Sequence, residues 1–184
     1  MKASDLFVKC LEAEGVTKIF GIPGEENADL MISLKKSKIE FVLCRHEQAA
    51  AFMADVYGRL TGKAGVCLAT LGPGVTNLMT GLADANMDRA PVVAIIGQGS
   101  TERLHKESHQ IMDSISMVAP ISKWAQTILS AKNVTEVVRK AFKVAETEKP
   151  GVTVIELPED VAKEEVNENP IKPSLIRRPA ADYR

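Results

Sequence analysis

The sequence has few aromatic residues and no excess of charge of either sign. Phe, Trp and Tyr make up 4% of its 184 residues, and 23 Lys and Arg stand against 24 Asp and Glu, for a formal net charge of −1. Proteins that bind nucleic acids need a basic surface for the phosphates, and those that stack bases need aromatic platforms. The composition therefore predicts no nucleic-acid partner.

Long apolar runs and paired cysteines are also absent. No stretch of about 18 apolar residues occurs, so we expect no membrane-spanning helix. The first residues lack the apolar region of a signal peptide. Cys10, Cys44 and Cys67 form neither a CxxC pair nor an even disulfide framework, and each is best interpreted as a small buried residue. This cysteine usage predicts a reducing, cytoplasmic location.

The sequence does contain apolar runs that alternate with amphipathic segments. Hydrophobic residues make up 45% and charged residues 26%, which is typical of a soluble folded domain. A first helix is predicted from a cap at Ser4 to a terminating Gly15. The other predicted helices cover residues 27–36, 47–61, 75–87 and 133–146. Strands are predicted at residues 18–20, 39–44, 65–71, 91–97 and 152–157, with a short one at 121–124.

Strands that are apolar throughout and alternate with helices indicate a parallel sheet covered on both faces. We therefore predict an α/β fold with a doubly wound, roughly six-stranded parallel sheet and helices on both faces. The predicted domain covers residues 1–166. Residues 167–184 are rich in Asn, Pro and Arg with little periodicity, and are predicted to be a linker to a further domain.

Ligands of such sheets bind beyond the carboxyl ends of the strands, where three glycine-rich or polar turns are predicted. The turns are residues 21–25, 45–48 and 72–77. A single glycine-rich turn is weak support for a site, because many strand-to-helix turns need glycine. Glu47 begins an alanine-rich helix, where a carboxylate either serves the helix dipole alone or shares a proton with a ligand.

Residues 98–110 are polar and are predicted to form a loop that lines the site. His105 and His109 have HxxxH spacing, but no third metal ligand is nearby, so a metal site is not predicted. His46 is interpreted as a structural hydrogen-bonding group. Gly72-Pro73-Gly74 is not a phosphate-binding loop, because no Gly-Lys-Ser/Thr follows it.

Taken together, the turns resemble the thiamine-diphosphate enzymes of the acetolactate synthase group. The resemblance spans residues 3–161 and rests on motifs in the family's order, which are Gly21-Ile22-Pro23-Gly24, Arg45-His46-Glu47-Gln48-Ala49-Ala50-Ala51-Phe52-Met53-Ala54, Thr70-Leu71-Gly72-Pro73-Gly74-Val75-Thr76-Asn77, Ala83-Asp84-Ala85, Pro91-Val92-Val93-Ala94-Ile95-Ile96-Gly97 and Glu156-Leu157-Pro158-Glu159-Asp160-Val161. It covers the family's N-terminal, pyrimidine-binding (PYR) domain.

The resemblance implies roles for individual residues. Glu47 would hydrogen-bond the ring nitrogen of the cofactor's aminopyrimidine and so activate the thiazolium carbon, and Gln110 would face substrate. Pro23 and Gly24 would lie against the pyrimidine or the substrate, with Gly72 and Asn77 lining the cleft near Glu47. His109 stands before the glutamine where the biosynthetic enzymes usually have Phe. At this position the sequence resembles the catabolic, flavin-independent branch, so a requirement for FAD is in question.

The family's Gly-Asp-Gly motif, which anchors the diphosphate and Mg²⁺ in a C-terminal domain, does not occur here. The resemblance therefore implies half of a cofactor site, completed by that missing domain and by a second copy of the chain, with the dimer interface at the cleft. The complete enzyme would be a transferase, a carboligase that condenses two pyruvates to 2-acetolactate and CO₂. It would act in branched-chain amino acid or acetoin metabolism. The isolated chain is expected to be inactive.

Three alternatives remain at this stage. The chain could belong to an enzyme for another 2-keto acid or acyl-CoA. It could instead be a non-catalytic dimerisation or binding module. A generic nucleotide-binding domain is the third alternative, although the sequence has no phosphate fingerprint.

Overall fold

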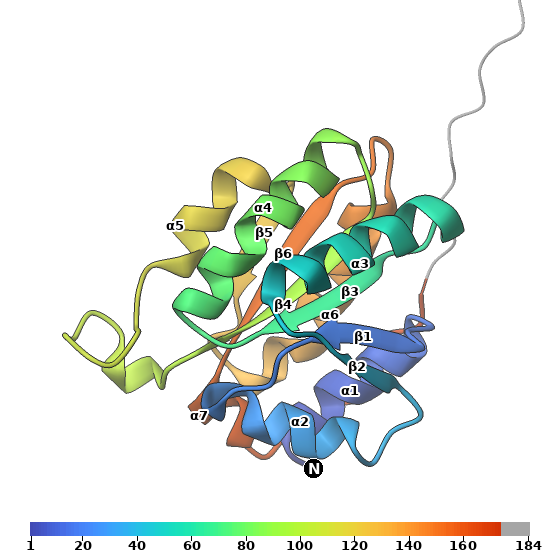
Figure 1. The fold of residues 1–184 in the computed structure, drawn as a ribbon. Helices are drawn as coiled ribbons and strands as arrows, with labels where there is room; N and C mark the ends of the chain where they lie inside the picture. Colours follow the sequence, from blue (N-terminus) through green and yellow to red (C-terminus); the bar gives the residue numbers. More distant parts are fainter. Residues whose placement is uncertain (174–184) are drawn as a thin grey trace, which may run out of the picture.

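The fold is a single parallel sheet of six strands in the order β2-β1-β3-β4-β6-β5 in a computed structural model that describes residues 1–173 (Figure 1). The predicted doubly wound α/β fold is thereby confirmed. The order reverses direction between β1 and β3, which is the arrangement that opens a crevice at the carboxyl edge of a sheet. The strands are β1 (Lys18–Gly21), β2 (Glu40–Leu43), β3 (Gly65–Ala69), β4 (Val92–Gln98), β5 (Trp124–Thr127) and β6 (Val152–Pro158).

Helices cover both faces of the sheet, as the sequence predicts (Figure 1). Successive residues of a strand point to opposite faces, so the two faces form separate cores. Val93 and Ile95 of β4 pack in the core with α1, α2, α6 and α7, whereas Ala94 and Ile96 pack in the core with α3, α4 and α5. The helices are α1 (Ala3–Ala13), α2 (Ala28–Leu34), α3 (Glu47–Thr61), α4 (Pro73–Met87), α5 (Ser114–Val118), α6 (Val134–Glu146) and α7 (Glu159–Lys163).

Several local predictions are wrong at the level of single residues. Helix α1 begins at Ala3, and Ser4 is not its cap but a buried residue whose hydroxyl accepts a hydrogen bond from Ser33 at 3.0 Å. The predicted strand at 121–124 lies at Trp124–Thr127 instead, because residues 119–121 form a 3-10 turn led by Pro120. Gln98 belongs to β4 rather than to the loop. The short helices α5 and α7 had no periodic signal long enough to predict them.

Helices α3 and α4 lie side by side above the sheet and are joined by one arginine (Figure 1). Arg59 of α3 forms two hydrogen bonds of 2.7 Å with the carboxylate of Asp55, which is only 2% exposed. The same guanidinium contacts Asp84 at 3.1 Å and Asp88 at 2.7 Å, at the end of α4. The arginine therefore neutralises a buried carboxylate and fixes the two helices that border the candidate site.

The two ends of the predicted domain meet in space. Lys2 and Glu165 form an antiparallel bridge, and the backbone amide of Val166 donates to the carbonyl of Met1 at 2.9 Å. Val166 is 8% exposed, and residues 167–173 after it form neither helix nor strand. The rest of the predicted linker, 174–184, lies outside the described residues. In the part that is described, no helix combines the length and apolar character needed to span a bilayer.

Candidate functional site

The three predicted turns meet at one edge of the sheet. They follow β1, β2 and β3, which are neighbours in the strand order, and parallel strands end at the same edge. Residues 21–24 come from β1, His46 and Glu47 from the turn after β2, and Gly72 from the turn after β3. The carboxyl edge of the sheet thus brings together residues that are about 50 positions apart in the chain.

Glu47 is the first residue of α3 and lies with its side chain almost buried, at 9% exposure. Asn77 of α4 donates a hydrogen bond from Nδ2 to its Oε2 at 2.9 Å. Gly74 adjoins the other oxygen, since a Cβ added there would lie 3.7 Å from Oε1. Among residues 1–173, Asn77 is the hydrogen-bond partner of this carboxylate, so Oε1 remains free to pair with a ligand.

His46 fixes the start of the same helix. Its Nδ1 accepts a hydrogen bond from the backbone amide of Gln48 at 3.2 Å, and its backbone is extended, as expected of an N-cap. This contact agrees with the structural interpretation of His46. It satisfies a backbone amide in the first turn of α3, next to Glu47.

The turn after β1 packs against the end of β3. A Cβ at Gly24 would lie 2.4 Å from Cβ of Thr70, so only glycine fits there. Thr70 donates to Glu26 at 2.9 Å, and the amide of Gly24 donates to Asn27 Oδ1 at 2.9 Å. Pro23 is exposed at the tip of the turn. Sequence reasoning missed Thr70 and Glu26, although a polar residue that directly follows a buried strand is a usable signal.

Gln110 lies against the start of α4, although it is 38 positions from Gly72 in the chain. A Cβ at Gly72 would lie 2.6 Å from the carbonyl oxygen of Gln110 and 2.9 Å from its Cβ. Gly72 and Gly74, two residues apart, therefore adjoin Gln110 and Glu47, respectively. The side chains of Gln110 and His109 are exposed, and Gln110 adopts a positive φ of 55°. The predicted site residues Glu47, Asn77, Gly72 and Gln110 thus share one end of α4.

The Gly72 contact predicts a specific effect of Gly72→Ala. We expect this change to displace the backbone near Gln110 and to destabilise the chain by about 1–3 kcal/mol, because the new methyl group overlaps the Gln110 carbonyl. Denaturant unfolding and hydrogen exchange of residues 108–112 measure both effects. Gly15→Ala is the matched control, since Gly15 also has a positive φ (83°) but nothing within 4 Å of the added Cβ. If both changes destabilised the chain equally, the positive φ and not the contact with Gln110 would be the cause.

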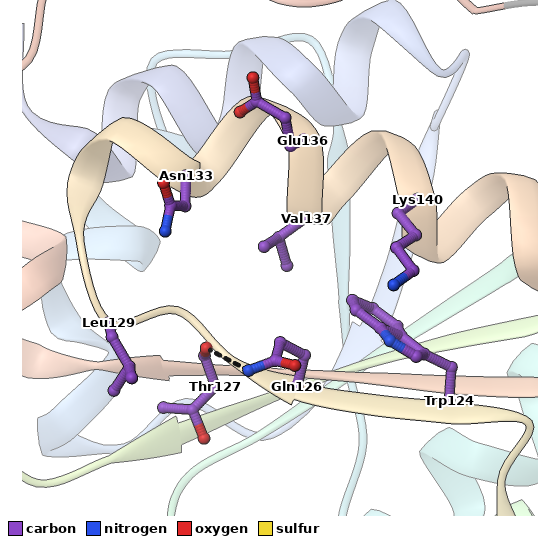
Figure 2. Close-up of a pocket in the computed structure, with 8 residues that line it drawn as sticks. All are labelled: Trp124, Gln126, Thr127, Leu129, Asn133, Glu136, Val137 and Lys140. Atoms are coloured by element: carbon purple, nitrogen blue, oxygen red, sulfur yellow. Dashed lines mark hydrogen bonds between the residues drawn. The ribbon is translucent and has the colours of Figure 1, made fainter.

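A separate cavity of about 290 Å³ lies between β5 and α6 (Figure 2). Figure 2 shows Lys140 above the indole of Trp124, with Nζ 4.9 Å from the ring centroid. Strand β5 is the edge strand opposite β2, so this cavity is on the far side of the sheet from Glu47. It is not the place where the predicted site residues meet.

The arrangement matches a known family. The sequence family described as "Thiamine pyrophosphate enzyme, N-terminal TPP binding domain" matches residues 1–117. The chain belongs to this family. The resemblance that the three turns predict is therefore confirmed, and thiamine diphosphate is the cofactor that the family binds.

Relatives within this thiamine pyrophosphate family are acetolactate synthases. The chain is 45% identical to "Acetolactate synthase, catabolic" of Raoultella terrigena over 158 residues, which is 86% of this chain and 28% of that protein. It is 39% identical over 183 residues to "Acetolactate synthase" of Bacillus subtilis, covering 98% of this chain and 32% of the relative. "Acetolactate synthase isozyme 2 large subunit" of Escherichia coli is 40% identical over 161 residues, 88% of this chain and 29% of the relative. The chain thus spans less than a third of these relatives.

The residues present fit one end of thiamine diphosphate. A buried carboxyl group with one oxygen held by Asn77 has its other oxygen free to share a proton with a ring nitrogen of an aminopyrimidine. The glycines at positions 24, 72 and 74 let Thr70, Gln110 and Glu47 approach the backbone closely at the same edge of the sheet. Within residues 1–173, no three or more His, Cys, Asp and Glu side chains gather in a way that could hold a metal ion.

Proposed function

We propose that this chain supplies the pyrimidine-binding half of the cofactor site in an acetolactate synthase. The observation that supports this most directly is Glu47, a buried carboxylate at the start of α3 with one oxygen bonded to Asn77 and the other available. In a chain of the thiamine pyrophosphate family, such a group binds the ring nitrogen of the cofactor and holds a proton there. When bound, the cofactor supplies a nucleophilic carbon and an electron sink.

The other residues have supporting roles in this proposal. Asn77 orients the Glu47 carboxylate, since its amide nitrogen fixes one of the two oxygens. Pro23, Gly24 and Gly72 line the cleft next to the ring or the substrate. Gln110 hydrogen-bonds the substrate from the loop that lies on Gly72, and His109 stands beside it at the mouth of the site.

The complete enzyme is proposed to join two pyruvates, releasing CO₂ and forming 2-acetolactate, which makes it a transferase of the carboligase type. His109, where the biosynthetic enzymes usually have Phe, favours the catabolic branch without FAD. Incubation of the full-length protein with a panel of 2-keto acids, with and without FAD, tests both statements. A product other than acetolactate from pyruvate would assign the chain to a different member of the family.

A second copy of the chain is the proposed partner at the cleft. Helix α3, which begins with Glu47, exposes Met53, Val56 and Leu60 on one face, at 44%, 50% and 83% exposure. Large apolar side chains in a row on one helix face are typical of a protein contact. Residues 167–184 would lead to a further domain, and a C-terminal domain would bind the diphosphate and Mg²⁺. We expect this enzyme in the cytoplasm, because its cysteines are unpaired.

Calorimetric titration of thiamine diphosphate with Mg²⁺ tests the half-site. We expect no saturable heat with this chain alone, because phosphate and metal contacts supply much of the affinity for such a ligand. Binding should appear when the C-terminal diphosphate-binding domain is added, and the Glu47→Gln chain in the same mixture serves as the comparison. Tight binding to this chain alone would mean that it contains a phosphate site of its own and that the proposed division is wrong.

A further inference from the structure

The loop that holds Gln110 is closed at its base by one buried side chain. Gln98, the last residue of β4, is 2% exposed. Its Nε2 donates one hydrogen bond to the carbonyl of Met112 at 3.1 Å and another to Oε1 of Glu156 at 3.0 Å. Its Oε1 accepts from the amide of Gly99 at 3.0 Å. Gln98 thus joins the end of the loop, two residues after Gln110, to the centre of the sheet.

Glu156 lies in the middle of this chain of hydrogen bonds. It belongs to β6, is 3% exposed, and accepts a second hydrogen bond on Oε2 from the hydroxyl of Thr127 at 2.6 Å. Burial raises the pKa of Glu156, and the hydrogen bonds from Thr127 and Gln98 oppose that rise. Retaining a carboxyl group at the core of a sheet is costly unless each oxygen is bonded. Both oxygens are bonded here, so the group is a fixed acceptor.

A fixed acceptor determines how the Gln98 amide is oriented. The carboxylate of Glu156 can only accept, so Gln98 must turn its NH₂ side toward β6. The second hydrogen of the same NH₂ group then points at the carbonyl of Met112, while the amide oxygen faces Gly99. Glu156 therefore acts on Met112 through Gln98, and it also interacts with the side chain of Ser114, which directly follows the loop.

The other anchors of the loop hold its first half. Thr101 donates from its amide and its hydroxyl to Asp160, and Arg103 contacts Glu159 at 3.3 Å, both at the start of α7. Beneath the second half lies a cavity of about 390 Å³ lined by Gln98, Met112, Thr127 and Glu156 among others. The loop residues on either side of Gln110, Lys106 and Ile111 among them, therefore face a cavity and not close-packed side chains. Three contacts hold the second half of the loop: the Gln98 hydrogen bond, the contact with Gly72, and the hydrogen bond that Arg103 donates to Ser108 at 2.8 Å.

We propose that Gln98 and Glu156 are positioning residues that hold the Gln110 loop against the start of α4. The effect on catalysis rests on the proposed function, in which Gln110 binds substrate. The effect on the loop itself, which Gln98 and Glu156 hold in place, follows from the hydrogen bonds and burial alone. Neither residue is needed to touch the cofactor or the substrate.

A swapped pair of side chains tests this proposal at constant composition and charge. In the double variant Gln98→Glu/Glu156→Gln, the new amide at position 156 donates to the new carboxylate at position 98, and Thr127 and Gly99 keep their acceptors. The bond to Met112 is lost, and a carboxylate oxygen now faces that carbonyl oxygen, because a carboxylate has no hydrogen to donate. Gln98→Leu is the simpler variant. Gln126→Leu is the control, since Gln126 lines the same cavity and bonds the Thr127 carbonyl instead.

Hydrogen exchange of the 184-residue chain is the first measurement. The amides of Lys106, Ile111 and Ser114 are hydrogen-bonded within this segment, so peptides over residues 104–114 report its closure. We expect roughly tenfold faster exchange there in the swapped pair and in Gln98→Leu, and wild-type exchange in Gln126→Leu. The melting temperature of the swapped pair should stay near that of wild type. Unchanged exchange at 104–114 in both Gln98 variants would overturn the proposal.

Steady-state kinetics of the full-length protein is the second measurement. Loss of positioning should lower kcat/KM for pyruvate by about 10- to 100-fold in the swapped pair, with little further loss when Gln110→Ala is added. If the swapped pair and Gln110→Ala lowered kcat/KM independently, with additive losses in free energy, Gln98 and Glu156 would not act through Gln110. If the wild-type protein forms no acetolactate at all, the proposed function is wrong, while the exchange data still decide whether Gln98 holds the loop.

Discussion

Glu47→Gln is expected to reduce acetolactate formation by about 10²- to 10⁴-fold in the full-length protein, the range that a positioned acid or base contributes. The amide of glutamine has the size of the carboxyl group and can still accept the hydrogen bond from Asn77. It cannot exchange a proton with a ring nitrogen at Oε1, the oxygen left without a protein partner among the described residues. The chemical step should therefore fail while the fold stays intact.

Product formation from pyruvate at saturating cofactor measures this effect, with circular dichroism and melting temperature to confirm folding. Glu102→Gln removes the same charge from an exposed position in the turn after β4, at the same edge of the sheet, and is expected to leave the rate unchanged. Acetolactate formation by Glu47→Gln within a few-fold of wild type would show that Glu47 serves only the start of α3.

Arg59→Met is expected to have the largest effect on stability, about 2–3 kcal/mol. The carboxylate of Asp55, which is 2% exposed, loses its two hydrogen bonds. The contacts with Asp84 and Asp88 at the end of α4 are removed as well. An unpaired buried charge costs more than the pair contributes, which is why the loss exceeds that of a surface ion pair. Because the arginine itself is 39% exposed, we place the effect below the fully buried case. Urea unfolding measures it directly, and the melting temperature should fall by roughly 5–10 °C.

The double variant Asp55→Asn/Arg59→Met separates burial of a charge from loss of the link between helices. Asparagine removes the buried charge and keeps the shape, so the double variant should regain part of the stability that Arg59→Met loses. Arg89→Met, next to Asp88 at an exposed position, controls for removal of one positive charge. A double variant less stable than Arg59→Met would mean that the unpaired Asp55 charge is not the source of the loss.

The apolar pattern of the sequence was sufficient to predict the sheet and the edge at which the site lies. Five of the six strands and the five longer helices lie where the runs and periodicities predict them, because burial on both faces of a parallel sheet requires apolar residues throughout each strand. The turns after β1, β2 and β3 follow from the same pattern. The position of Glu47 at the start of α3 could also be predicted, because the start of a helix has local signals in glycine, proline and capping residues.

What the pattern could not predict is which side chains meet. The bond from Asn77 to Glu47, the contact of Gly72 with Gln110 and the chain from Thr127 through Glu156 and Gln98 to Met112 each join residues 14 to 58 positions apart along the sequence. Hydrophobic periodicity specifies the face of an element that is buried, but it contains no information on the partner of a polar group. Hydrophobic patterning alone was therefore sufficient to predict the fold and the edge of the sheet where the site lies. The contacts of Glu47 and Gln110 depend on the three-dimensional fold, because the crossovers between parallel strands bring distant residues to within hydrogen-bond distance.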